Sequence, residues 1–297
     1  MVPVAASALS LRDLGGPRRD ARVLAPFPTA LYLALDRHHE VLPVLTRDAL
    51  ALPTALRVPH VADALRWNVE QGDVVEVGGG SVRLPGMRLS TGRVWHPAPV
   101  RPVSPAARAR CAVPTGLVGE AVSQALRGLA ADLTAAVITG HDLRPGLRGL
   151  VGAGAGLTPS GDDAVCGVLL ALRALGVLDD RFDRLVAAVE QALPTTTSIS
   201  ASLLVAAADG YALPDVVRLV GAAVTGRPRE LAGTLPAVLA VGHSSGADLV
   251  AGLLGALDAT APQPSSPSRA RRRPPRPHRP ATAPVHHPPQ PEGARRD

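Results

Sequence analysis

The residues best suited to bind a small molecule lie in the stretch GAGAGLTPSGDD, residues 152–163. Thr158 can cap a helix, Pro159 suits its first position, and Asp162 and Asp163 then fall in the first turn, where negative charge complements the helix dipole. These features stabilise a helix without any ligand. The glycines that precede them, including Gly154 and Gly156, need a further reason, since glycine is typical of places where backbone approaches something closely.

The same pattern recurs eighty-five residues later. SGDDAVCGVLL, which begins at Ser160, aligns without a gap on SGADLVAGLLG, which begins at Ser245. Asp163 matches Asp248 and Gly167 matches Gly252, whereas Ala247 replaces Asp162. We interpret this as a duplicated helical unit whose two helix starts lie side by side. The repeated aspartates are expected to hold structure, which makes Asp162 the better functional candidate.

A third hydroxyl-rich helix start, PTTTSIS, lies between the two repeats, and GHSSG precedes the second. If the three helix starts converge, they form a pocket with many neutral donors. The candidate catalytic residues are Asp162, Asp163 and His243. The candidate substrate-binding residues are Gly154, Gly156, Thr158, Ser160, Gly161, Thr196, Thr197, Ser198, Ser244, Ser245 and Asp248.

Two kinds of ligand suit this predicted pocket. One is a small polar or anionic molecule, such as a carboxylate, an amide or a phosphate. The other is a divalent cation such as Mg²⁺, held by Asp162, Asp163 or Asp248 and bridging to an anion. His243 suits a general acid or base and equally a solvent-facing loop residue. The identity of any metal or cofactor stays open.

The blocks GAGAGLTPSGDDAVCGVLLAL, PTTTSISASLLVAAADG and AVGHSSGADLVAGLLGAL occur in this order. Together they resemble a bacterial family named for one of the three subunits of the oxamate carbamoyltransferase of anaerobic allantoin degradation. The resemblance is loose from about residue 22 and strong after 150. It implies a component of a hetero-oligomeric complex that moves a carbamoyl group between oxalurate and phosphate, giving oxamate and carbamoyl phosphate. The alternative is a non-catalytic scaffold or assembly subunit without a ligand site.

Composition excludes several other functions. The chain has no lysine, so it has neither a Walker loop nor a lysine Schiff base, and its two cysteines are too few for a disulfide framework. The net charge of +6 arises entirely from residues 261–297, which hold eight arginines and two acidic residues. We expect weak nucleic-acid contact through this tail at most. No signal peptide or membrane span is predicted, and a cytoplasmic location fits best.

The elements that must position the site predict an α+β protein. A small antiparallel β-sheet or barrel precedes an all-helical bundle that contains the duplicated helix start. We expect an N-terminal extension (1–21), a β-rich domain (22–100), a linker (101–114), a helical domain opened by Thr115 (115–258) and a disordered basic Pro/Arg-rich tail (259–297).

Overall fold

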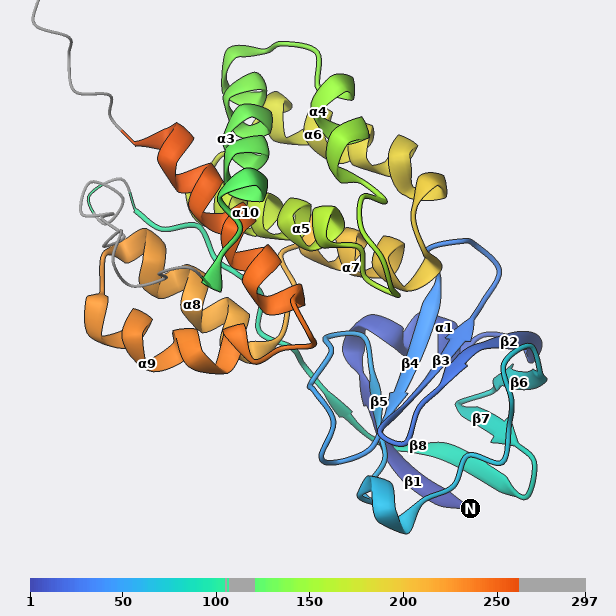
Figure 1. Cartoon of the computed structure of the whole chain (residues 1–297). Coiled ribbons are helices and arrows are strands. Elements are labelled where there is room, and N and C mark those ends of the chain that lie inside the picture. The colour runs from blue at the N-terminus through green and yellow to red at the C-terminus, as the bar shows by residue number, and fades with distance from the viewer. Residues whose placement is uncertain (105, 107–120, 262–297) are drawn as a thin grey trace, which may run out of the picture. The chain divides into compact units, whose positions relative to one another are not determined.

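The computed structural model describes residues 1–104, 106 and 121–261. Most of the predicted linker, the predicted helix start at Thr115 and nearly all of the predicted tail therefore lie outside the described residues. The described chain has the predicted α+β organisation, with a β-barrel followed by helices (Figure 1). No helix among the described residues is both long and apolar enough to cross a membrane.

Eight strands form a closed barrel in the order β1-β5-β4-β3-β2-β6-β7-β8. Most neighbours are antiparallel, but β1 runs parallel to β8 and β4 runs parallel to β5. Alternate residues of β2 point into the apolar interior, which is the burial pattern of a strand with one solvated face. The strands are β1 (Val2–Ser7), β2 (Arg19–Pro26), β3 (Ala30–Ala34), β4 (Val41–Leu45), β5 (Leu56–Arg57), β6 (Val74–Gly78), β7 (Ser81–Leu84) and β8 (Met87–Trp95).

The first strand lies outside the β-rich range that the sequence predicts. β1 closes the barrel by pairing with β8, and the short helix α1 (Leu11–Gly15) follows it, so residues before 22 belong to the barrel. VPVAAS is a weak strand signal because it is short and rich in alanine. The two runs predicted at 87–89 and 93–96 form one strand, since Gly92 packs against Pro3 without breaking the pairing of β8 with β1.

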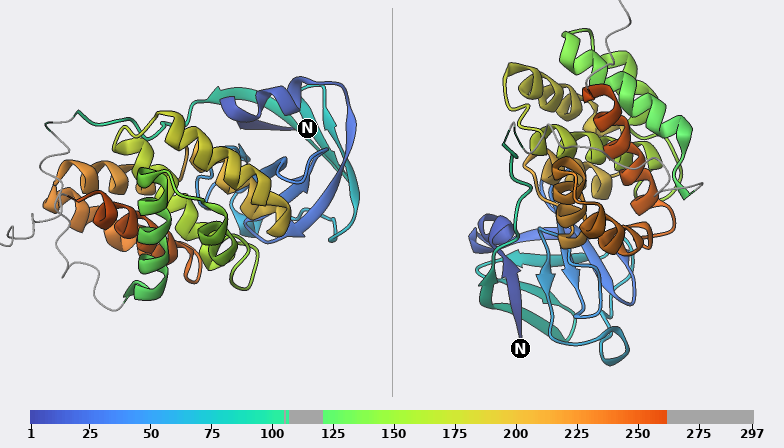
Figure 2. Two further views of the ribbon diagram at one scale, coloured as in Figure 1. Left: turned by 90° about the horizontal axis from the view of Figure 1, so that it is seen from above. Right: turned by 90° about the vertical axis from the view of Figure 1, so that its left-hand side faces the viewer.

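The helices after residue 121 form the second part of the structure (Figure 2). The predicted ranges after 160 agree with it to within three residues, while α4 was not predicted. In the described residues, the first long helix begins at Gln124, where Ser123 accepts a hydrogen bond from the Leu126 amide. These helices are α3 (Gln124–Thr139), α4 (Arg144–Leu150), α5 (Ser160–Ala174), α6 (Asp180–Ala192), α7 (Ser198–Ala208), α8 (Pro214–Thr225), α9 (Pro228–Leu239) and α10 (Ser245–Thr260).

Helix α5 lies at the centre of the helical region, where it packs against α3, α4, α7, α8 and α10 (Figures 1 and 2). Thirteen of its fifteen residues are buried, including both aspartates of its first turn. A helix that is apolar on every side must be surrounded by others. The start of α5 is therefore an interior position, where each polar group needs a partner.

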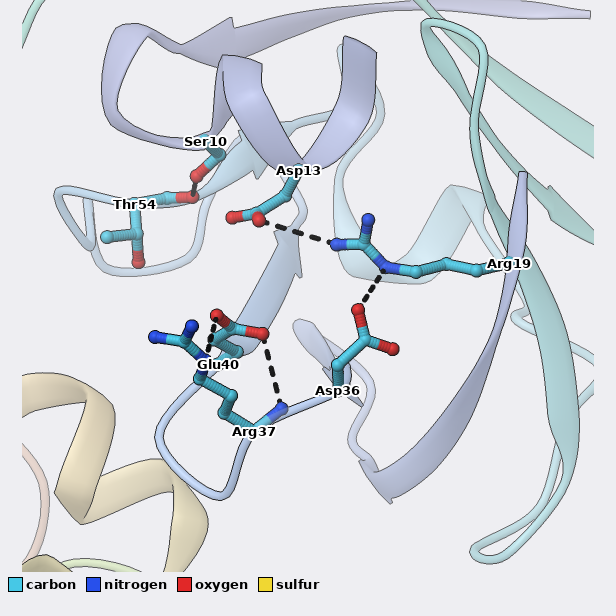
Figure 3. Close-up of polar contacts among 7 residues, drawn as sticks. All are labelled: Ser10, Asp13, Arg19, Asp36, Arg37, Glu40 and Thr54. Carbon is cyan, nitrogen blue, oxygen red and sulfur yellow. Dashed lines mark hydrogen bonds and ion pairs between the residues drawn. The ribbon is translucent and has the colours of Figure 1, made fainter. Parts of the chain in front are cut away.

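The turn between β3 and β4 is fixed by local contacts (Figure 3). The Arg37 amide donates to the Glu40 carboxylate over 3.2 Å, and Arg19 lies 3.4 Å from Asp13 and 3.2 Å from Asp36. Burial is the main cause that raises the pKa of Asp13, and Arg19 opposes it. These contacts hold the turn that carries His38.

Candidate functional site

The glycine-rich loop before α5 packs against the chain itself. Gly152 and Gly154 have φ angles of 77° and 127°, in the left-handed region that favours glycine. A Cβ on Gly152 would lie 2.5 Å from the Thr195 carbonyl oxygen, and one on Gly161 would lie 1.9 Å from that of Leu150. Close approach to protein backbone therefore explains these glycines without a ligand.

The capping predicted for this loop is wrong. Helix α5 begins at Ser160, and Pro159 holds the N-cap position without a side-chain cap. The hydroxyl of Thr158 lies 2.9 Å from that of Ser245, at the start of α10. A residue expected to cap its own helix thus connects two helix starts.

The duplicated helices lie side by side, as the repeat predicts. A Cβ on Gly167 would lie 2.2 Å from the Leu249 carbonyl oxygen, and one on Gly252 would lie 1.9 Å from that of Ala164. These contacts are equivalent, because Ala164 and Leu249 occupy the same position of the repeat. The two glycines let the backbones of α5 and α10 touch and bring Asp163 close to Asp248.

Asp162 is fully buried and its carboxylate is saturated with hydrogen bonds. The Gly152 amide donates to Oδ1 over 2.8 Å, and the Ser200 hydroxyl donates to Oδ2 over 2.7 Å. Oδ2 also accepts from the Thr196 hydroxyl. The residue that the sequence favours for function thus connects the glycine-rich loop to α7. Its lone pairs are directed at the protein.

Asp163 and Asp248 have the opposite character. They are 7% and 6% exposed, and in each the Oδ2 atom is buried without a hydrogen-bond partner among the described residues. Burial raises the pKa of Asp163 to about 7; the neighbouring charges of Asp248 and Asp162 raise it further, and hydrogen bonds with Ser245 and Thr158 oppose the shift. Asp163 also lines a cavity. The repeated aspartates, expected to be structural, are the ones with free acceptor capacity.

The hydroxyls of the third helix start are used within the protein. Thr197 caps α7 by accepting from the Ser200 amide, and its hydroxyl donates to the Leu157 carbonyl over 2.5 Å. Ser198 bonds to Nδ1 of His38 over 3.1 Å, while Nε2 of His38 lies 2.9 Å from the Thr196 carbonyl oxygen. His38, expected to be a solvated surface residue, joins the barrel to the start of α7.

The remaining candidates are dispersed around the two helix starts. His243 and Ser244 are exposed in the loop before α10, and His243 does not line the cavity that contains Asp163. Gly154 and Gly156 are exposed, while Ser160 is the half-buried first residue of α5. The structure therefore brings together Thr158, Asp163, Ser245 and Asp248 from the predicted set.

Cys166 lies one turn after Asp162 and lines the same cavity as Asp163. Burial raises the pKa of its thiol well above the usual value, so it stays protonated and packs as a small apolar side chain. In the part of the chain that the structure describes, no three His, Cys, Asp or Glu side chains form a group that could hold a metal ion. The contacts thus give the predicted Mg²⁺ no support.

The comparison with protein families matches this region. Residues 150–257 match the family model described as oxamate carbamoyltransferase subunit AllH, which confirms the resemblance predicted from the three sequence blocks. The match runs from the glycine-rich loop into α10 and does not include the barrel. No solved structure matches the chain.

Proposed function

We propose that this chain is a subunit of a carbamoyltransferase-type complex and that Asp163 binds the NH₂ group of a carbamoyl or primary amide ligand. The observation that carries the proposal is the buried, unpartnered Oδ2 of Asp163 beside a cavity. A carboxylate only accepts hydrogen bonds, and an amide nitrogen supplies two donors. The family match supports the carbamoyl chemistry and the presence of other subunits.

Two hydroxyls complete the proposed amide site. Thr158 and Ser245 lie 2.9 Å apart and interact with Asp163. Because a hydroxyl hydrogen rotates, either residue can donate to the carbonyl oxygen of an amide whose nitrogen faces Asp163. Asp248 carries a second unpartnered carboxylate oxygen nearby. Its negative charge disfavours a ligand carboxylate or phosphate at this position.

This argument sharpens the predicted ligand class. Oxamate and oxalurate each carry a primary amide and a carboxylate, and the carboxyl groups of the site favour binding through the amide end. Carbamoyl phosphate has the same NH₂ group attached to an anionic phosphate. The anionic end must then point away from Asp163 and Asp248. The proposal concerns binding and orientation, and it assigns no bond-breaking step to this chain.

The test uses isothermal titration of the full-length chain with oxamate at pH 6 and pH 8. An amide donor needs ionised Asp163, so its affinity is expected to rise about tenfold as the pH passes 7. Asp163→Asn is expected to weaken binding at least tenfold, whereas Asp180→Asn, at the exposed first turn of α6, serves as the matched control. Tighter oxamate binding at pH 6 than at pH 8 would contradict an amide bound by ionised Asp163.

The second candidate is the non-catalytic assembly subunit. It is favoured by the contacts of Asp162, Thr196 and Thr197, all of which are explained by packing within the chain. It predicts no thermal stabilisation by oxamate, oxalurate or carbamoyl phosphate, because a ligand that binds the native state must raise its stability. Stabilisation that depends on Asp163 would exclude this candidate.

A further inference from the structure

The cavity beside Asp163 is mostly apolar. Its volume is about 280 Å³, and Thr158, Asp163 and Ser245 are among its few polar lining residues. One apolar wall comes from α7, with Ile199, Leu203 and Ala207. The barrel contributes Phe27, Tyr32 and Leu52. Small-molecule sites commonly combine such walls with a few polar groups that fix orientation.

The cavity also gathers apolar side chains that are exposed to solvent. Phe27, Leu50 and Leu157 are 41%, 50% and 42% exposed, and all three line it. They come from the barrel and from the glycine-rich loop, so folding has brought them together from distant parts of the sequence. A cluster of exposed apolar side chains around a cavity is typical of a binding site.

We propose that this cavity binds a small molecule with a primary amide or carbamoyl head group and an aromatic or branched aliphatic body. The head group lies at Asp163, which rests on the function proposed above, and the body packs between Ile199 and Leu203 of α7 and the barrel residue Tyr32. The chemistry of the walls selects the body, and the unpartnered carboxylate oxygen selects the head group.

Oxamate alone does not match these walls. Once its amide faces Asp163, its carboxylate would lie among apolar side chains, where an unpaired charge is costly. An aromatic body fits better, since Phe27 and Tyr32 already form an edge-to-face pair with ring centroids 6.2 Å apart and an angle of 83°. The tyrosine is itself largely buried, which raises its pKa. The lining thus indicates a larger and less polar substrate than the family description names.

The test is a titration of the full-length chain at pH 8 with acetamide, isobutyramide, benzamide, benzoate, benzylamine and oxamate. Each buried methylene is expected to tighten binding about fourfold, so benzamide should bind at least tenfold more tightly than acetamide or oxamate. Benzoate has the same body with a carboxylate head, and it should bind at least tenfold more weakly than benzamide.

Variants show whether this cavity is the place of binding. Ala212→Trp fills the cavity and is expected to abolish the preference for benzamide over acetamide. Ala237→Trp, on the exposed face of α9, is the matched control. Leu203→Ala removes part of the wall and should weaken benzamide binding while leaving acetamide binding unchanged. Circular dichroism of each variant verifies folding.

The outcomes separate the two proposals. Oxamate binding that equals or exceeds benzamide binding and is lost in Asp163→Asn would leave the proposed function and overturn the apolar body. Binding of benzylamine without any amide would overturn the proposed function, because the site would then select a cation. A flat response to all six compounds would overturn both proposals and favour a side chain from another protein of the complex as the occupant.

Discussion

The first turn of α5 has two sides that differ in how their polar groups are satisfied. On the side facing α7, the Asp162 carboxylate accepts hydrogen bonds from a backbone amide and two hydroxyls. On the side facing α10, Asp163 is almost as deeply buried, yet its Oδ2 atom has no partner among the described residues. The difference shows that burial alone does not mark function. What matters is whether the lone pairs of a buried carboxylate are already used.

The largest expected effect comes from the α7 side. Asp162→Ala leaves the Gly152 amide and the Thr196 and Ser200 hydroxyls without their acceptor, and unpaired buried donors cost about 1–3 kcal/mol each. We expect unfolding in urea to show a loss of about 4 kcal/mol. Asp180→Ala, in the exposed first turn of α6, should lose less than about 1 kcal/mol. Equal losses in the two variants would show that Asp162 has no special structural role.

The α10 side is next, and it tests the contact between the duplicated helices. Gly252→Ala places a methyl group 1.9 Å from the Ala164 carbonyl oxygen, so α5 and α10 must separate, and we expect a loss of about 3 kcal/mol. Gly233→Ala in α9 meets nothing within 4 Å and should gain about 0.5–1 kcal/mol from helix propensity. Thermal unfolding of both variants measures the difference, and a neutral Gly252→Ala would contradict this contact.

Asp163→Asn sharpens the comparison because it should stabilise the protein. The pKa of Asp163 is raised in the folded state, so folding favours the protonated carboxyl, and stability falls as the pH rises from about 4 to about 7. The asparagine variant cannot ionise. We expect it to be more stable than the wild type by about 2 kcal/mol at pH 8 and equal to it near pH 4. Urea unfolding at the two pH values measures this. A variant less stable at pH 8 would show that the carboxylate is satisfied after all.

The sequence predicted much of this region because its signals are local. The repeat starting at Ser160 and Ser245 predicted two neighbouring helices, and Gly167 and Gly252 have the close contacts inferred from it. Alternating apolar residues predicted β6 and β7 to within one residue. In each case the pattern itself expresses the packing requirement.

The roles of the aspartates could not be predicted in the same way. Helix geometry shows that Asp162 and Asp163 point in different directions, about 100° apart, but not which direction faces donors. Thr196 and Ser200 lie more than thirty residues away and reach Asp162 only after α7 packs on α5. The cavity was missed for a related reason, since Phe27 and Tyr32 come from the barrel, which the sequence treats as a separate domain.

His38 provides the smallest effect and tests the same long-range placement. Its ring connects the β3–β4 turn to Thr196 and Ser198, one residue of which also holds Asp162. Because these contacts are exposed to solvent, His38→Ala should cost only about 0.5–1 kcal/mol of global stability. Since Thr196 is shared, the variant should also increase hydrogen exchange at the start of α7, whereas His39→Ala should leave that exchange unchanged. If exchange there is unaltered in both variants, the barrel contact does not support the saturated side of α5.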